Sequence, residues 1–277
     1  MTVRIVTDSA CDLRGDEVDD LGIQVVPLSI RFGDQEFVDR EELDVGEFYR
    51  RLAESEDLPE TAAPSPGRFE QAFRRQLDDG ADAIVCVNLA AALSATMQSA
   101  RTAAAALDAD IRVVDSRSIT AGLGSIALES ARMGRDGASA DDIVAAIDSM
   151  SDRTHIYAAL DTLDNLKKGG RIGGAQALLG SMLAIKPMLD LSSGEVVEAG
   201  RQRTRKKALQ WLSNKLAEFP EVENLAIMHG EAPDIDAFLE MIDPIVDLSS
   251  ARVDKIGAVI GTHGGPRVMG IAFQVPA

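Results

Sequence analysis

The segment Val3-Arg-Ile-Val-Thr-Asp-Ser9 opens the chain with a β-rich run and closes on small polar residues. This order predicts a β-strand that ends in a turn, and the amphipathic stretch from Asp12 to Leu21 predicts the helix that follows. An apolar run followed by a helical pattern returns at Ile84–Val87 and at Ile111–Val114. Strands that alternate with helices are typical of a mainly parallel sheet with helices on both faces. We therefore expect an α/β fold for the first half of the chain.

Local turn and capping signals predict the other elements of this half. Gly33-Asp34 is a plausible hairpin turn, and Asp44, Ser65 and Ser94 are candidate helix caps, with a proline-interrupted loop before Ser65. The expected strands cover 23–31 and 35–38, and the expected helices cover about 45–54, 66–77, 95–107, 119–133 and 140–150.

The second half also mixes helices and strands, but its strands suggest antiparallel pairing. Ser192-Ser-Gly194 predicts a hairpin turn. The expected helices cover 162–174, the stretch from there to about 185, 203–218 and 235–241, and the expected strands include 156–160, 246–253, 258–261 and 268–275. A chain of 277 residues fits two domains. We expect an N-terminal α/β domain over 1–153 and a C-terminal mixed-sheet α/β domain over 154–277.

Composition and charge exclude several classes of partner. The chain has 45 acidic and 28 basic residues, and its formal charge of −17 repels nucleic acid at long range. Its apolar runs fall far short of the roughly 20 residues of a membrane-spanning helix, so no integral membrane segment is expected. The N-terminal residues do not resemble a signal peptide, and two cysteines are too few for a disulfide framework. We expect a cytoplasmic protein.

The common catalytic motifs are absent, and no cysteine pair has the spacing of a metal site. We therefore expect neither a metal nor a cofactor. Of the three histidines, His263 lies between Gly261 and the Gly264-Gly265-Pro266 turn, where little side-chain bulk blocks a ligand. An imidazole at this position suits the binding of an anion.

Two loops are candidates for an anion site. The loop from Thr61 to Ser65 and the loop before Ser94 each lead into a predicted helix, whose free N–H groups and dipole favour negative charge. The simpler alternative is that Ser65 and Ser94 only cap their helices. The glycines around Arg171 match no phosphate loop, and close helix packing is the favoured interpretation there.

A cluster of cations interrupts this acidic sequence. We call it the basic segment, and it comprises Arg201, Arg203, Arg205, Lys206 and Lys207. Cations at a helix N-terminus oppose the helix dipole and gain nothing locally. We therefore expect the basic segment to dock an acidic partner, and a solvated helix face is the alternative.

Taken together, these segments resemble the DegV family of bacterial fatty-acid-binding proteins. The resemblance rests on an ordered set of motifs along the whole chain: Val6-Thr-Asp-Ser9, Thr61-x-x-Pro-Ser65, Leu93-Ser-Ala-Thr96, Gln98-Ser-Ala100, Val114-Asp-Ser116, Leu166-Lys-Lys-Gly-Gly-Arg-Ile172, Arg203-Thr-Arg-Lys-Lys-Ala208 and Gly261-Thr-His263. It implies a two-domain α/β fold with a buried long-chain fatty acid, which many members hand to a separate kinase that makes the acyl phosphate. The protein is then a substrate carrier and not an enzyme.

The resemblance also implies which residues bind the ligand. The family's carboxylate-binding threonine falls on Thr61 and its histidine on His263. A Ser-Ser pair of the family is replaced here, so the backbone N–H of Ala91 is the expected donor, with Ser94 three residues away. The departures from the family pattern are Ala90, Ala91, Ala95 and Arg267.

Two other functions remain open. A small-molecule phosphotransferase or hydrolase would use His263 as nucleophile or base, since folds of this kind also host sugar-kinase chemistry. A regulatory sensor would bind the lipid only as a signal. An enzyme needs a second titratable group beside His263, and none is visible in the sequence, which favours binding.

Overall fold

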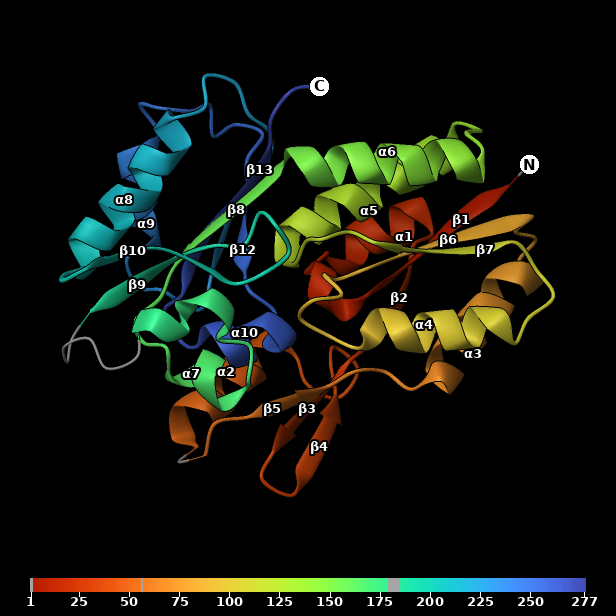
Figure 1. Cartoon of the computed structure of the whole chain (residues 1–277), viewed down its shortest axis with the longest axis horizontal. Helices are drawn as coiled ribbons and strands as arrows, with labels where there is room; N and C mark the ends of the chain where they lie inside the picture. The colour runs from red at the N-terminus through yellow and green to blue at the C-terminus, as the bar shows by residue number, and fades with distance from the viewer. Residues whose placement is uncertain (1, 56, 179–184) are drawn as a thin grey trace.

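A computed structural model describes residues 2–55, 57–178 and 185–277. Its first half contains a four-stranded parallel sheet in the order β2-β1-β6-β7 (Figure 1). The strands are β1 (Val3–Asp8), β2 (Gln24–Val26), β6 (Ala83–Asn88) and β7 (Ile111–Asp115). The predicted parallel sheet is confirmed.

Helices cover both faces of this sheet, as its apolar strands require. On one face, α3 (Pro66–Asp78) and α4 (Thr96–Ala105) pack against side chains such as Val6 and Ile84. On the other face, α5 (Thr120–Arg135) and α6 (Ala140–Arg153) pack with Ile5 and Val85. The helix α1 (Gly15–Leu21) lies next to α5. Successive residues of β1 and β6 therefore point to opposite faces of the sheet and pack into two different hydrophobic clusters.

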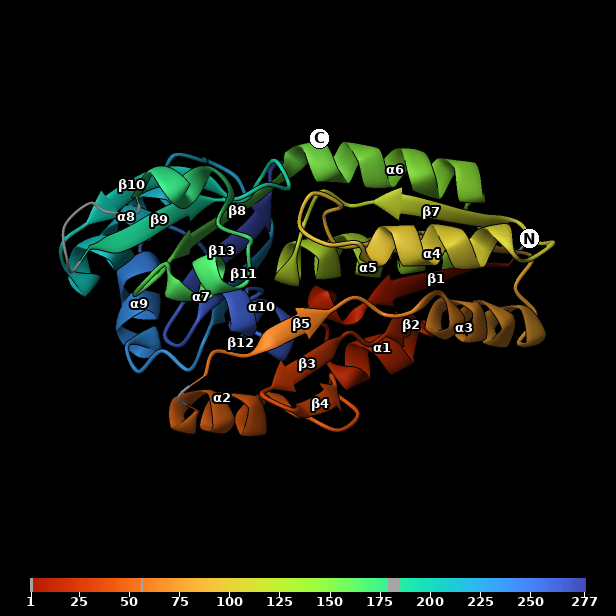
Figure 2. The same cartoon turned by 60° about the horizontal axis from the view of Figure 1, so that its bottom comes forward.

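A small antiparallel sheet extends from this half in the order β4-β3-β5 (Figure 2). Its strands are β3 (Ser29–Phe32), β4 (Gln35–Val38) and β5 (Glu60–Ala62), and α2 (Val45–Glu54) lies between β4 and β5 in the chain. The β3–β4 hairpin and the Asp44 cap of α2 are confirmed. The single strand expected over 23–31 is wrong: Pro27 lacks an N–H for a ladder, so β2 and β3 belong to different sheets.

The second half forms a six-stranded sheet in the order β10-β9-β8-β13-β11-β12. The strands are β8 (Thr154–Ala159), β9 (Lys186–Asp190), β10 (Val197–Gln202), β11 (Glu223–His229), β12 (Arg252–Lys255) and β13 (Met269–Gln274). All neighbours pair antiparallel except β11 and β12, which are parallel, so the predicted mixed sheet is confirmed. The helices α8 (Arg205–Ala217) and α9 (Ile235–Ile242) pack against each other, and α8 lies on the sheet.

Three expectations for this half differ from the structure. The strand expected over 258–261 is part of a helix, α10 (Ala258–Gly264), and only the last two residues of the strand expected over 246–253 are in a strand, as the start of β12. The predicted helix to about 185 begins instead as a 3₁₀ helix, Gly173–Leu178, and its next residues, 179–184, lie outside the described residues. Short apolar runs do not distinguish a strand from a short helix, which explains the error at α10.

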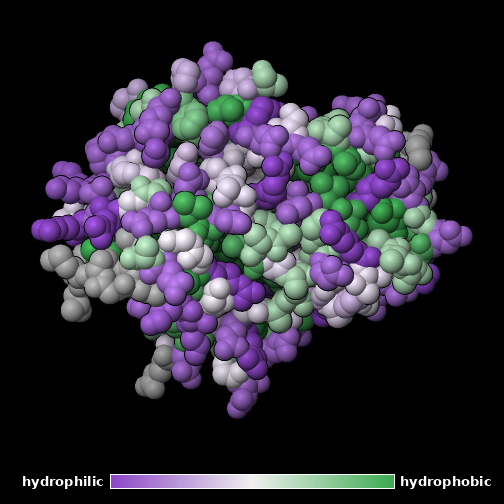
Figure 3. All heavy atoms as spheres, in the orientation of Figure 1, coloured by the Kyte–Doolittle hydropathy of each residue, from purple (hydrophilic) through white to green (hydrophobic). Residues whose placement is uncertain are grey.

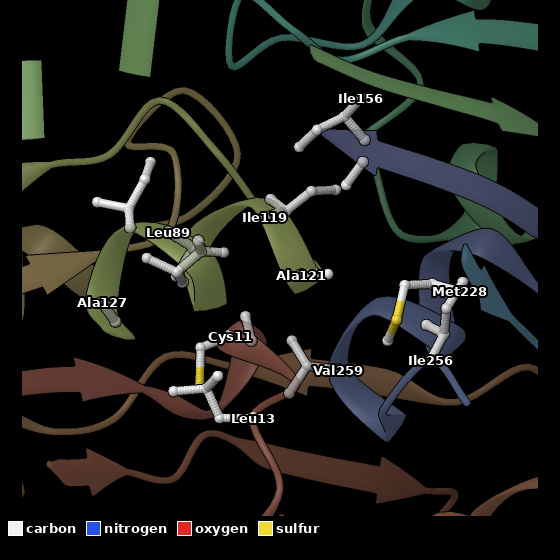
Figure 4. Close-up of a cluster of buried hydrophobic side chains, with 14 of the residues drawn as sticks. Cys11, Leu13, Leu89, Ile119, Ala121, Ala127, Ile156, Met228, Ile256 and Val259 are labelled. Atoms are coloured by element: carbon white, nitrogen blue, oxygen red, sulfur yellow. The ribbon is translucent and has the colours of Figure 1, made fainter. Parts of the chain in front are cut away.

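One hydrophobic cluster joins the two larger sheets. Figure 4 shows side chains from both halves in it, such as Cys11 and Leu89 from the first and Ile156 and Met228 from the second. The end of α6 and the start of β8 coincide with the predicted boundary. Because the cluster is shared, the division into domains over 1–153 and 154–277 stays a prediction. Within the described ranges, no helix is long and apolar enough to cross a membrane.

Candidate functional site

An apolar cavity lies where the two larger sheets, the small sheet and α10 meet. The space among its lining residues is about 890 Å³, and this value includes open solvent. Most of its lining is aliphatic, and the lining residues with polar side chains are Thr61, Ser94, Thr120, Tyr157, Arg171 and His263. A cavity of this kind suits a ligand with a long apolar body and one polar end.

The register of the second sheet explains the shape of the cavity floor. Gly270 on β13 pairs with Met228 on one side and Ala158 on the other, and Ala158 pairs with Leu189. Paired residues share a sheet face, and all four line the cavity. The small residues therefore form a shallow channel between larger aliphatic side chains.

The parallel sheet contributes the opposite wall at its topological switch point. In the order β2-β1-β6-β7 the chain crosses from one side of β1 to the other, and the connections after β1 and β6 lead to helices on opposite faces of the sheet. Asp8 fills the crevice: its carboxylate accepts from the backbone N–H of Leu89 at 2.9 Å and from Asn88 Nδ2 at 3.1 Å. The loop after β6 then brings Leu93 and Ser94 to the cavity.

Thr61 and His263 meet at the cavity although 202 positions separate them in the chain. Thr61 lies on β5, paired with Ile30, and His263 lies in the last turn of α10. The helix α10 packs against β3 and β5, which brings Thr61 Oγ1 to 2.9 Å from His263 Nε2. The structure therefore brings together the two side chains that the sequence placed at one site.

His263 is neutral at physiological pH. Burial, together with the nearby positive charge of Arg171, lowers its pKa to about 4. Its Nδ1 is buried and has no hydrogen-bond partner among the described residues. A buried donor without an acceptor is costly, so we assign the proton to Nε2. His263 then donates to Thr61 Oγ1, and the Thr61 hydroxyl proton is free to donate to a ligand.

Ser94 also lies in the cavity wall, but it does not cap α4 as expected. Ala95 holds the N-cap position, and Ser94 Oγ lies 2.9 Å from Thr96 Oγ1 and accepts from the Thr96 N–H at 3.3 Å. Ser65 occupies the N-cap position of α3, but its side chain makes no capping bond.

Sequence reasoning missed Arg171 as a site residue. Its Nε donates to the carbonyl of Leu93 at 3.0 Å, and its Nη1 donates to the carbonyl of Gly169 at 2.7 Å. These two bonds to carbonyl groups hold the guanidinium in the cavity wall. The glycine-rich motif around Arg171 was the available signal, because tight backbone turns let the side chain fold back to the site.

Ala91 does not reach the cavity. Its side chain is exposed, and its N–H donates to Asp115 Oδ1 at 3.1 Å. The same carboxylate oxygen also accepts from the Arg117 N–H. The expected donor is therefore engaged by the carboxylate at the end of β7, and Ala91 is absent from the cavity lining.

The basic segment divides into one bound cation and four exposed ones. Arg205 forms two hydrogen bonds to Asp234, at 2.8 and 3.0 Å, and lies 3.6 Å from Asp161. Asp161 also contacts Lys186 at 2.9 Å and Arg267 at 3.5 Å. The exposed members are Arg201, Arg203, Lys206 and Lys207. Arg205 is thus occupied within the fold and is not available as a docking residue.

Comparisons with known proteins give a consistent result. The family model described as an uncharacterised protein of the DegV family matches residues 2–275. A DegV domain-containing protein of Streptomyces coelicolor is 36% identical over 276 residues, which are 98% of each chain.

Solved structures agree with this match. A structure described as fatty acid binding of a DegV family protein from Thermus thermophilus is 31% identical, with a TM-score of 0.90 over 100% of both chains. A stearic-acid-binding protein from Eubacterium ventriosum is 26% identical, with a TM-score of 0.88 over 98% of both chains.

Proposed function

The chain belongs to the DegV family, and from this premise we propose that it binds a long-chain fatty acid in the cavity. Thr61 and Ser94 donate to the carboxylate in this proposal, His263 orients the Thr61 hydroxyl, and the aliphatic lining holds the acyl chain. The observation that carries the proposal is the hydrogen-bonded Thr61–His263 pair in the wall of a mostly aliphatic cavity.

The apolar lining supplies the binding energy for the acyl chain. Burial of each methylene contributes about 0.8 kcal/mol, so some fifteen methylenes contribute on the order of 10 kcal/mol before the costs of association. The lining includes Leu28, Leu89, Ile119, Ile156, Leu191 and Ile271. We propose a saturated or unsaturated acid of about fourteen to eighteen carbons as the ligand.

The carboxylate needs hydrogen bonds and a compensating charge, because a buried unpaired charge is costly. The hydroxyls of Thr61 and Ser94 are donors of the required kind. Arg171 provides positive charge in the same wall, while neutral His263 orients the Thr61 hydroxyl. Ala91 has no part in this arrangement.

We further propose that the protein is a carrier and that a separate kinase converts the bound acid to the acyl phosphate. The lining contains no acidic side chain among the described residues, so His263 lacks the orienting carboxylate of a catalytic dyad. This argues against the phosphotransferase or hydrolase alternative. The four exposed cations of the basic segment suit an acidic face of the kinase.

The proposed location is the cytoplasm. The two cysteines, Cys11 and Cys86, are free and buried, as is usual in a reducing compartment.

The proposal predicts that protein purified from a bacterial host carries a fatty acid of about fourteen to eighteen carbons. Organic extraction of native protein and mass spectrometry of the extract test this directly. Absence of stoichiometric lipid in repeated preparations, together with no uptake of added palmitate or oleate, contradicts the proposal.

Substitution of the carboxylate-binding residues tests the site. Thr61→Val and His263→Ala should each weaken palmitate binding by about 1–3 kcal/mol, because the first removes a donor to the carboxylate and the second removes the group that orients this donor. Calorimetric titration measures the change. Thr102→Val is the matched control, since the Thr102 hydroxyl is exposed on α4 and bonds only the Gln98 carbonyl among the described residues. If Thr61→Val and His263→Ala bind like the parent, the carboxylate lies elsewhere.

A further inference from the structure

The last turn of α10, which carries His263, is held by a buried side chain of another helix. Asn165 lies on α7 (Asp164–Lys168) and is 4% exposed. Its Nδ2 donates to the carbonyl of Thr262 at 3.0 Å. The last carbonyls of a helix have no partner within the helix itself, and Thr262 directly precedes His263. Asn165 therefore fixes the backbone from which the imidazole projects.

The residue at the end of α7 defines the space in which the imidazole lies. Gly169 has φ −73°, an ordinary helical value that any residue adopts, so its backbone does not require glycine. A methyl group at this position would overlap Nδ1 and Cε1 of His263. The ring of His263 thus occupies the space that a side chain at position 169 would fill, and any larger residue there displaces the ring.

Neither residue belongs to the cavity lining. We propose that Asn165 and Gly169 are positioning residues for the headgroup site: Asn165 fixes the last turn of α10, and Gly169 fixes the ring of His263 against Thr61. This inference rests on the proposed function and extends it to two residues that do not touch the ligand.

The contact with Gly169 also determines which ring nitrogen carries the proton. Nδ1 faces a backbone segment that offers it no acceptor among the described groups. The proton therefore stays on Nε2, which keeps Thr61 Oγ1 as its acceptor and leaves the hydroxyl proton for the carboxylate. Displacement of the ring breaks the hydrogen bond from His263 Nε2 to Thr61 Oγ1, so the Thr61 hydroxyl is no longer oriented towards the carboxylate.

The first experiment compares Gly169→Ala with Gly15→Ala. Gly15 is also a helical glycine with an exposed position, and a methyl group there meets no atom within 4 Å. Affinities for palmitate and for hexadecan-1-ol are measured by titration for each protein. Gly169→Ala should lower the preference for palmitate over the alcohol roughly tenfold, the effect of one lost hydrogen bond. Gly15→Ala should leave this preference unchanged.

The second experiment measures the ¹⁵N chemical shifts and the titration of the His263 ring, and it needs no ligand. In protein labelled with ¹⁵N-histidine, the ring signals of His263 are assigned by their loss in His263→Gln. Gly169→Ala and Asn165→Leu should each change the Nε2 and Nδ1 shifts of His263 and its titration, while Gly15→Ala should not. Two separate variants guard against the failure of one of them to fold.

The outcomes separate the two proposals. If the parent protein prefers palmitate and Gly169→Ala retains both that preference and the parental His263 signals, the positioning role is wrong. If the parent takes up no palmitate, the proposed function fails, and the ¹⁵N signals alone then decide whether Asn165 and Gly169 position the ring.

Discussion

The protonation state of His263 links the site to the stability of the fold. In the unfolded chain this histidine titrates near its ordinary pKa of 6.5, whereas in the folded protein burial lowers the pKa to about 4. The unfolded state therefore binds more protons than the folded state between these values. Stability is fully present above pH 6.5 and falls as the pH is lowered towards 4.

This argument predicts the behaviour of His263→Gln. Between pH 7 and pH 4 the parent should lose about 3 kcal/mol of unfolding free energy relative to the variant, which has no titrating group at this position. Urea unfolding at several pH values measures the difference. Burial raises the pKa of Asp8 and of Asp39 to about 6, which acts in the opposite direction, but both proteins share those groups and the effect cancels. A difference that stays constant with pH contradicts the assignment of a neutral, buried ring.

Some residues of the candidate site could be predicted from the sequence, and others could not. Thr61 and His263 could be placed together only through the family resemblance, because the contact joins β5 to α10 across 202 positions. Ala91 was expected as a donor, but the structure has its N–H donating to the carboxylate of Asp115 at the end of β7, which no local signal in the sequence predicts. Arg171 was missed because its role depends on how its own backbone turns after α7.

Among the elements, those with local signals were predicted well. The helix α2 follows an Asp44 cap that accepts from the Glu47 N–H, and α3 begins with Pro66, whose φ suits the first helical position. The strand β5 was missed, because three residues carry no periodic pattern and the strand exists only through its pairing with β3. A strand that is stabilised by residues far away in the chain has no local sequence pattern from which it can be predicted.

The floor strand β13 yields a prediction about chain length. A Cβ at Gly270 would lie 3.5 Å from the Tyr157 carbonyl oxygen and 3.7 Å from that of Met228, which are ordinary contacts. Gly270→Val therefore fits the sheet, and its methyl groups enter the channel. Stearate should lose about 1–3 kcal/mol of binding free energy from the overpacked channel, while the shorter laurate should lose less.

Calorimetric titration of both acids against the parent and Gly270→Val measures this difference. Stability should change little, since the new side chain enters an apolar cavity. Equal losses for stearate and laurate would mean that the acyl chain does not run along the Met228–Gly270–Ala158 row.

At the scale of the whole molecule, acidic residues are in excess, and the formal charge is −17. Figure 3 shows hydrophilic residues over much of one face. Many exposed arginines pair with a neighbouring carboxylate, as Arg50 does with Glu54 at 2.6 Å. Arg201, Arg203, Lys206 and Lys207 are exposed and have no ion pair within the described ranges. Docking of an acidic partner at these four cations stays a proposal, and a solvated helix face is the alternative.

The proposed carrier role predicts the effect of reversing this charge. Arg203→Glu with Lys206→Glu should slow association with a cognate kinase roughly tenfold or more at low salt, because exposed charges mainly set the association rate. Palmitate affinity should not change, since neither residue lines the cavity. Arg75→Glu with Arg101→Glu is the matched control: both residues are exposed on α3 and α4, and the change in net charge is the same.

Stopped-flow association across a salt series distinguishes docking at the basic segment from an effect of net charge. If both double variants slow association equally, net charge alone controls the encounter and the basic segment is an ordinary solvated helix start. If only the first variant does so, and its effect shrinks as salt screens the charges, the kinase docks at the start of α8.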